Sequence, residues 1–89
     1  MDQVKFDFTG RVAIVTGAGK GIGRAIARSF AASGANVVLA GRHRDTLEAA
    51  ARECERLSGS TAVVPTDVRN VPDVRAMVGQ ALEKFGLNS

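Results

Sequence analysis

The segment TGAGKGIGRAIA, residues 16–27, decides the fold of this 89-residue chain, because two patterns of different period meet in it. Before it, RVAIVT (11–16) is a short β-branched run that suits a buried strand. After it, apolar or small residues recur every three or four positions, as on one face of a helix. These positions are Ile22, Ala25, Ile26, Ser29 and Phe30. We therefore predict a strand, a glycine-rich turn and a helix in direct succession.

The same alternation of strand and helix continues along the chain. NVVLA (36–40) and TAVVP (61–65) predict two further strands, and each is followed by an amphipathic helical pattern. Asp45 is expected to cap the second helix and Asn70 the third. The inner positions of these helices are Leu47, Ala50, Ala51, Cys54 and Leu57, then Val74, Met77, Val78, Ala81, Leu82 and Phe85. Such alternation predicts an α/β fold, the βαβαβα half of a doubly wound parallel sheet with strand order 3-2-1.

Composition excludes several classes of protein. The net charge of +3 could suggest a nucleic-acid partner, but the arginines are spread along the chain, and Tyr and Trp are absent. Cys54 is the one cysteine, so an internal disulfide is excluded and a reducing compartment is favoured. No apolar run reaches the roughly 18 residues of a membrane span. His43 has no evident partner group, so we expect it to be a loop residue and not a ligand or a base. Together, the composition predicts a cytoplasmic protein without a metal site, a nucleic-acid partner or a membrane partner.

The glycines of the opening segment point to a bound anion. Gly17, Gly19, Gly21 and Gly23 fall within seven residues, although each glycine costs folding entropy. A glycine turn between strand and helix aims helix N–H groups beyond the strand end, where they and the helix dipole favour a phosphate. The spacing fails G-x-G-x-x-G, because Ile22 stands at its last position, and fits T-G-x-x-x-G-x-G. The residues therefore predict a phosphate close to the main chain.

The stretch GRVAIVTGAGKGIGRAIA resembles the amino-terminal part of the short-chain dehydrogenase/reductase family. FDFTGR, GANVVLAGR, PTDV and ALEKFG extend the resemblance over nearly all of residues 6–86. It implies a Rossmann-like fold and an oxidoreductase that transfers hydride between a nicotinamide cofactor and a carbonyl or alcohol. It also implies that the cofactor pyrophosphate and adenosine ribose are bound by Gly17, Gly21, Ile22 and Gly23. For Thr16 and Gly19, a role as turn formers alone stays open.

The resemblance also bears on the choice between NADP and NAD. NAD-preferring relatives carry an acidic residue after the second strand, where this chain has Gly41 and then Arg42. A guanidinium can grip a 2′-phosphate with two parallel hydrogen bonds. Lys20 matches a second basic position of NADP-preferring relatives. NADP is therefore expected over NAD, with the alternative that Lys20 and Arg42 are simply exposed loop charges.

Asp67 and Val68 follow the third strand and match the family's Asp-Val/Leu pair. The resemblance implies that the Asp67 carboxylate accepts a hydrogen bond from the adenine amino group and that Val68 flanks the ring. The alternative is that Asp67 only caps the turn.

The family's catalytic residues are missing. The motif Y-x-x-x-K cannot occur because the chain has no tyrosine, and the Asn-Asn-Ala-Gly segment is also absent, so we expect no catalytic residue. Residues 1–89 are interpreted as one partial NAD(P)-binding domain, truncated before the fourth strand and inactive alone. The first strand would then be an apolar open edge through which the chain self-associates. The alternative is a non-catalytic nucleotide-binding or interaction module that pairs with a full-length relative.

Overall fold

In the computed structural model, which describes residues 9–57 and 60–86, strands and helices alternate as the sequence predicts. The first residues of the FDFTGR match, 6–8, lie outside these ranges. The elements are β1 (Val12–Thr16), α1 (Gly21–Ala32), β2 (Asn36–Gly41), α2 (Arg44–Glu55), β3 (Thr61–Pro65) and α3 (Val71–Phe85).

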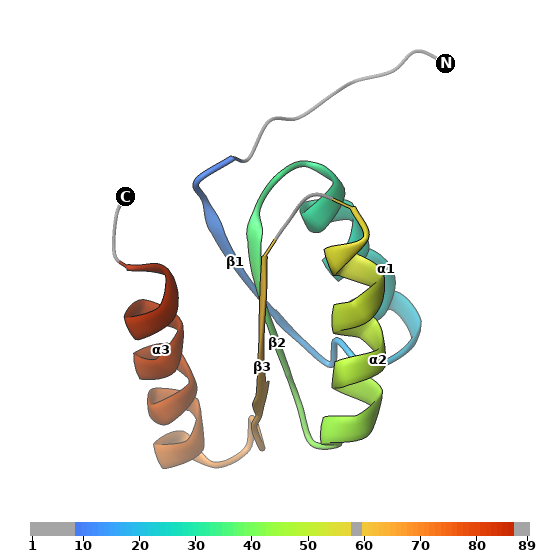
Figure 1. Cartoon of the computed structure of the whole chain (residues 1–89). Helices are drawn as coiled ribbons and strands as arrows, with labels where there is room; N and C mark the ends of the chain where they lie inside the picture. Colours follow the sequence, from blue (N-terminus) through green and yellow to red (C-terminus); the bar gives the residue numbers. More distant parts are fainter. Residues whose placement is uncertain (1–8, 58–59, 87–89) are drawn as a thin grey trace.

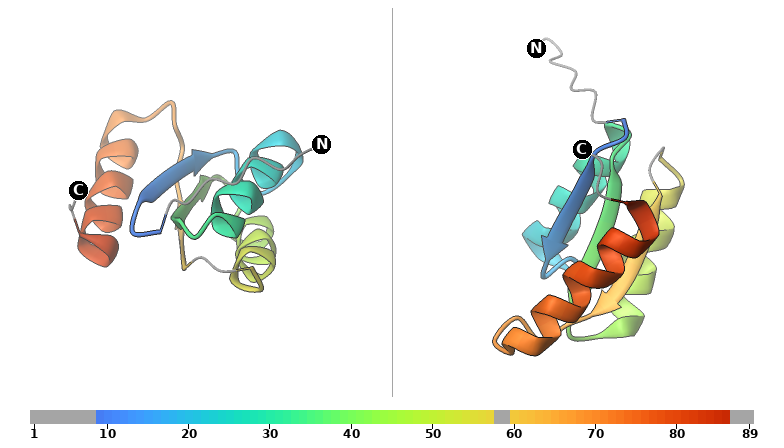
Figure 2. Two further views of the ribbon diagram at one scale, coloured as in Figure 1. Left: turned by 90° about the horizontal axis from the view of Figure 1, so that it is seen from above. Right: turned by 90° about the vertical axis from the view of Figure 1, so that its left-hand side faces the viewer.

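The three strands form one parallel sheet in the order β1-β2-β3, which is 3-2-1 from the other edge and confirms the predicted order. The register places Ile14 beside Val38, and Val38 beside Ala62. Helices α1 and α2 cover one face and α3 covers the other (Figures 1 and 2). Right-handed crossovers from β1 to β2 and from β2 to β3 place α1 and α2 on the same face, because both steps go in one direction across the sheet.

Each face of the sheet has its own apolar core. On the α1 and α2 side, Leu39 and Leu47 are almost fully buried, and Cys54 lies with them, as its helical position predicts. On the α3 side, Val38 and Val64 pack with Met77. Burial raises the pKa of the Cys54 thiol, which favours the uncharged form of a small core residue.

The predicted inner stripe of α1 is wrong for most of its positions. The buried residues of α1 are Ala27 and Ala31, whereas Ile22 is 79% exposed and Ile26 is 42% exposed. Small side chains let the helix approach the sheet closely. The stripe with Ala27 and Ala31 therefore faces the sheet, and the neighbouring stripe with Ile22 and Ile26 does not. Arg24 of α1 forms an ion pair with Glu53 of α2 at 2.7 Å. Because a helix turns by about 100° per residue, Ile22 and Ile26 lie away from the α2 side.

The helix caps match the sequence in one case and not in the other. Asn70 caps α3 as predicted, since its side chain accepts a hydrogen bond from the Asp73 amide at 3.0 Å. The prediction for α2 is wrong, because that helix begins at Arg44 with His43 as its N-cap. Asp45 therefore lies in the first turn, where its carboxylate accepts from the Thr46 amide and its charge favours the helix dipole.

The two edges of the sheet differ in how they are protected. At the β3 edge, the Lys84 ammonium donates to the Thr61 carbonyl at 2.8 Å, and Pro65 has no amide hydrogen to offer. At the β1 edge, Val12 and Ile14 are 38% and 41% exposed. Charges and proline block further strand pairing, so in the described part of the chain β3 carries the features of a natural edge and β1 does not.

We predict that Leu47→Ala lowers the free energy of unfolding by about 2–5 kcal/mol, because it opens a cavity in the α1 and α2 core. The control is Leu57→Ala. Leu57 was predicted as an inner position of the second helix, which is wrong, because its side chain is 46% exposed. Its truncation removes the same atoms and should change stability by no more than about 0.5 kcal/mol. Urea denaturation followed by circular dichroism measures both. Equal losses in the two variants would contradict the described core.

Candidate functional site

A pocket of about 440 Å³ lies where the three strands end. Its wall is formed by Thr16 and Gly17 at the end of β1, Gly41 and Arg42 at the end of β2, and residues 66–69 just after β3. The carboxyl ends of parallel strands meet at one edge of a sheet, so three segments that are distant in sequence come together here. Open α/β sheets bind their ligands at this edge.

Hydrogen bonds beyond the strand ends hold these loops in place. The Ala18 amide donates to the Ala40 carbonyl at 3.2 Å, which ties the glycine turn to β2. The Thr66 amide donates to the Gly41 carbonyl at 2.6 Å, and the Thr66 hydroxyl donates to the Val64 carbonyl at 2.8 Å. Thr66 is buried and lines the pocket, so these two hydrogen bonds fix the chain where it leaves β3.

The glycines of T-G-x-x-x-G-x-G serve two physical purposes. Gly17 and Gly21 have φ angles of +64° and +61°, in the left-handed region that favours glycine. Gly23 has an ordinary φ, but a Cβ atom there would overlap the carbonyl group of Gly17. The start of α1 therefore packs directly against the turn, and Gly23 makes that approach sterically feasible.

The N-terminus of α1 has no counter-charge from its own residues. Lys20 occupies the N-cap position without a side-chain cap, and no acidic residue lies in the first turn. By contrast, α2 and α3 carry Asp45 and Asp73 in their first turns. The amides of Gly21, Ile22 and Gly23 can thus donate hydrogen bonds to an external anion, which the positive end of the α1 dipole also favours.

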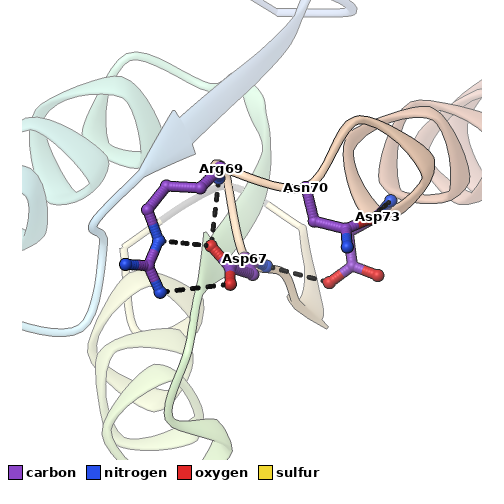
Figure 3. A network of polar contacts seen from close by, with 4 residues as sticks. All are labelled: Asp67, Arg69, Asn70 and Asp73. Carbon is purple, nitrogen blue, oxygen red and sulfur yellow. Dashed lines mark hydrogen bonds and ion pairs between the residues drawn. The ribbon is translucent and has the colours of Figure 1, made fainter.

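Asp67 is held in a local network of polar contacts (Figure 3). Its carboxylate accepts from the Arg69 amide at 3.0 Å, from Arg69 Nε at 3.1 Å and from Arg69 Nη2 at 3.3 Å. Its own amide donates to the Asp73 carboxylate at 3.1 Å, which joins the loop to α3. The hydrogen bonds from Arg69 hold the pKa of the Asp67 carboxyl below its usual range, with a smaller contribution from the charge of Arg42.

The structure brings together part of the predicted site in one pocket. Gly17, Arg42, Asp67 and Val68 all line it. The other predicted residues lie on the adjoining turn and the first turn of α1, outside the pocket wall: Lys20, Gly21, Ile22 and Gly23. Arg69 was not predicted as a site residue. The signal for it in the sequence is a basic residue two positions after Asp67, in the loop that follows the third strand.

Within residues 9–57 and 60–86, no three His, Cys, Asp or Glu side chains lie close enough to hold a metal ion. The helices of those same ranges are too short or too polar to cross a membrane.

Three comparisons give this geometry a context. The family model described as short chain dehydrogenase matches residues 11–87. An uncharacterized oxidoreductase of Staphylococcus haemolyticus is 42% identical over 80 residues, which are 90% of this chain and 34% of that protein. The short-chain type dehydrogenase/reductase of Mycobacterium marinum superposes with a TM-score of 0.86 at 37% identity, over 91% of this chain and 32% of that one.

A second solved structure carries ligands. L-sorbose reductase of Gluconobacter frateurii, complexed with NADPH and L-sorbose, superposes with a TM-score of 0.86 at 38% identity. The match covers 93% of this chain and 32% of that protein. This chain thus spans about a third of the length of the proteins that it matches.

We predict that Gly23→Ala destabilises the chain by about 1–3 kcal/mol, since the added methyl group must push α1 away from the Gly17 carbonyl. Gly79→Ala is the matched control. Gly79 also lies within a helix, but a Cβ there meets nothing within 4 Å, so its replacement should stabilise by up to about 1 kcal/mol. Thermal and urea unfolding of both variants measure the difference. A neutral or stabilising Gly23→Ala would contradict the close approach of the turn and the helix.

Proposed function

The chain belongs to the short-chain dehydrogenase family, and on that premise we propose that it is the NADP(H)-binding part of an oxidoreductase. The whole protein would transfer hydride between a nicotinamide cofactor and a carbonyl or alcohol substrate. The observation that carries this proposal is the strand-end pocket beside the uncapped start of α1. Residues 1–89 would form one part of a NAD(P)-binding domain, since the match covers about a third of each relative.

The glycine turn suits the pyrophosphate of a dinucleotide. Gly17 and Gly21 give the backbone its left-handed bends, and Gly23 lets the helix start close to the turn. The amides of Gly21, Ile22 and Gly23 would then donate to phosphate oxygens at the positive end of α1. These four residues are proposed to bind through their main chain, which agrees with the exposed Ile22 side chain.

The pocket wall suits a 2′-phosphorylated adenosine. Gly41 has no side chain to repel a phosphate, and the exposed Arg42 offers a guanidinium at the same strand end. Lys20 adds a second exposed cation beside the turn. We propose NADP as the preferred cofactor on these charges. Asp67 and Val68 would contact the adenine, through a hydrogen bond from its amino group and through contact with the ring face.

The bound nicotinamide would supply hydride transfer, and the residues of this chain would position the cofactor without moving a proton on the substrate. The chain contains no tyrosine, and therefore no Y-x-x-x-K motif. We propose that this chain alone binds a dinucleotide without turning over a substrate. A cytoplasmic location is proposed on the same sequence grounds as above, the single cysteine and the lack of an apolar span.

A second candidate function, an interaction module, is favoured by the β1 edge. Within residues 9–57 and 60–86, this edge has none of the charged and proline features that protect β3, and apolar side chains border it on both faces. Ile14 is exposed on the α3 side of the sheet, and the isoleucine stripe of α1 is exposed on the other. A right-handed crossover after α3, which lies opposite α1 and α2, also leads toward β1. We propose that β1 accepts another strand, from a second copy of the chain or from a longer relative.

We predict that the purified chain binds NADPH more tightly than NADH by isothermal titration calorimetry and does not oxidise NADPH with carbonyl compounds. Arg42→Glu should weaken NADPH binding by about tenfold to a hundredfold, the equivalent of one or two charge-assisted hydrogen bonds, and change NADH binding less. Arg75→Glu, on the exposed side of α3, is the charge-matched control. Equal affinity of the unaltered chain for both dinucleotides would refute the NADP proposal, and steady turnover would refute the claim of inactivity.

We predict that the chain self-associates at micromolar concentration in sedimentation velocity and that Ile14→Lys shifts it toward the monomer, because a lysine on an edge strand opposes pairing. Val71→Lys, at the exposed start of α3, places the same charge away from β1 and should leave association unchanged. A strictly monomeric unaltered chain would exclude self-pairing. If such a monomer binds a full-length relative through β1, the partner is the longer chain.

A further inference from the structure

Arg69 donates three hydrogen bonds to Asp67, whereas a surface ion pair can consist of a single contact. Its Nε, Nη2 and main-chain amide all donate to one carboxylate, at 3.0–3.3 Å. The Arg69 side chain is 74% exposed, and ion pairs of such exposure contribute little to folding stability. The contact nevertheless lies in the wall of the strand-end pocket, so its effect is expected on binding more than on stability.

The pocket wall holds two arginines and one carboxylate. Arg42 and Arg69 are its cations, and Asp67 is the one acidic residue among the described residues that line it. Arg42 lies within electrostatic reach of the same carboxylate, since its charge also contributes to the lowered pKa of Asp67. Without Arg69, Arg42 would be the nearest cation of the pocket wall to that carboxylate. Asp67 would then compete with a bound phosphate for Arg42.

We propose that Arg69 is a positioning residue that sets the cofactor preference: by occupying three of the roughly four acceptor sites of Asp67, it leaves the Arg42 guanidinium available for the 2′-phosphate of NADP. This inference rests on the proposed function and adds a residue that the glycine motif and the strand-end residues do not identify. It also explains how a pocket with a carboxylate in its wall can accept a phosphate. The formal charge of the wall is +1 with the two arginines and Asp67, and removal of Arg69 reduces it to zero.

The geometry of the guanidinium matters as well as its charge. Arginine presents a planar fork that can donate to both carboxylate oxygens, and Arg69 does so through Nε and Nη2. A lysine at this position would keep the charge and lose the fork. A carboxylate offers about four lone-pair sites, of which Arg69 takes three. One site therefore stays open for the adenine amino group.

The test measures dissociation constants of NADPH and NADH, and of adenosine 2′,5′-bisphosphate and adenosine 5′-monophosphate, by calorimetry with the full 89-residue chain. Arg69→Ala should reduce the preference for the 2′-phosphorylated ligands by about tenfold, the loss of roughly one charge-assisted hydrogen bond at Arg42. The preference of Arg69→Lys should lie between those of the unaltered chain and of Arg69→Ala. Arg75→Ala, which removes an exposed arginine from α3, should leave the preference unchanged.

The double variant Asp67→Asn with Arg69→Ala distinguishes two explanations of a reduced preference: competition by the freed Asp67 carboxylate, and a loss of local structure. It restores the wall charge to +1 and removes the competitor of Arg42, so the preference should return to within about threefold of the unaltered chain. An unchanged preference in Arg69→Ala, or no recovery in the double variant, would overturn the inference and leave the proposed function intact. If the unaltered chain binds no dinucleotide, or prefers NADH, the NADP proposal and this inference fall together.

Discussion

Parallel pairing of β1 with β2 and of β2 with β3 is the constraint on which the rest of this structure depends. Because all three strands run in one direction, their carboxyl ends reach the same edge, and the loops that follow them become neighbours. Main-chain hydrogen bonds extend this pairing past the strands, from Ala18 to Ala40 and from Thr66 to Gly41. The pocket is therefore a product of sheet geometry, and its side chains act on a backbone that is already positioned.

The sequence predicts most of the fold, because the deciding patterns are local. Each strand is a short β-branched run, and the α2 stripe with Leu47 and Cys54 has a single apolar face. The α1 stripe could not be chosen in the same way. Ile22 and Ile26 are more hydrophobic than Ala27 and Ala31, yet the alanines are buried, since the sheet accepts only small side chains at that distance. Only the tertiary structure decides between two adjacent stripes.

The site shows a similar division between motif and geometry. Positions that follow strand ends, such as Arg42 and Asp67, can be placed near one another from topology alone. The attachment of Arg69 to Asp67 depends on how the chain bends between β3 and α3, and that bend is fixed by Asp73 and Asn70 together. A role for the Asp67 carboxylate can be predicted from its position after the third strand, but the hydrogen bonds that Arg69 donates to it cannot. Lys20 lies outside the pocket wall, because it is the N-cap residue of α1.

The contact between Gly23 and the Gly17 carbonyl has a consequence for the gene as well as for the protein. Every single-base change in a glycine codon that alters the amino acid introduces a side chain with a Cβ atom or ends translation. Gly23 thus has no one-step neighbour in the genetic code that keeps the start of α1 against the turn. Variation among related genes should therefore reach this codon almost entirely through its silent third base, whatever substrate the encoded proteins come to use.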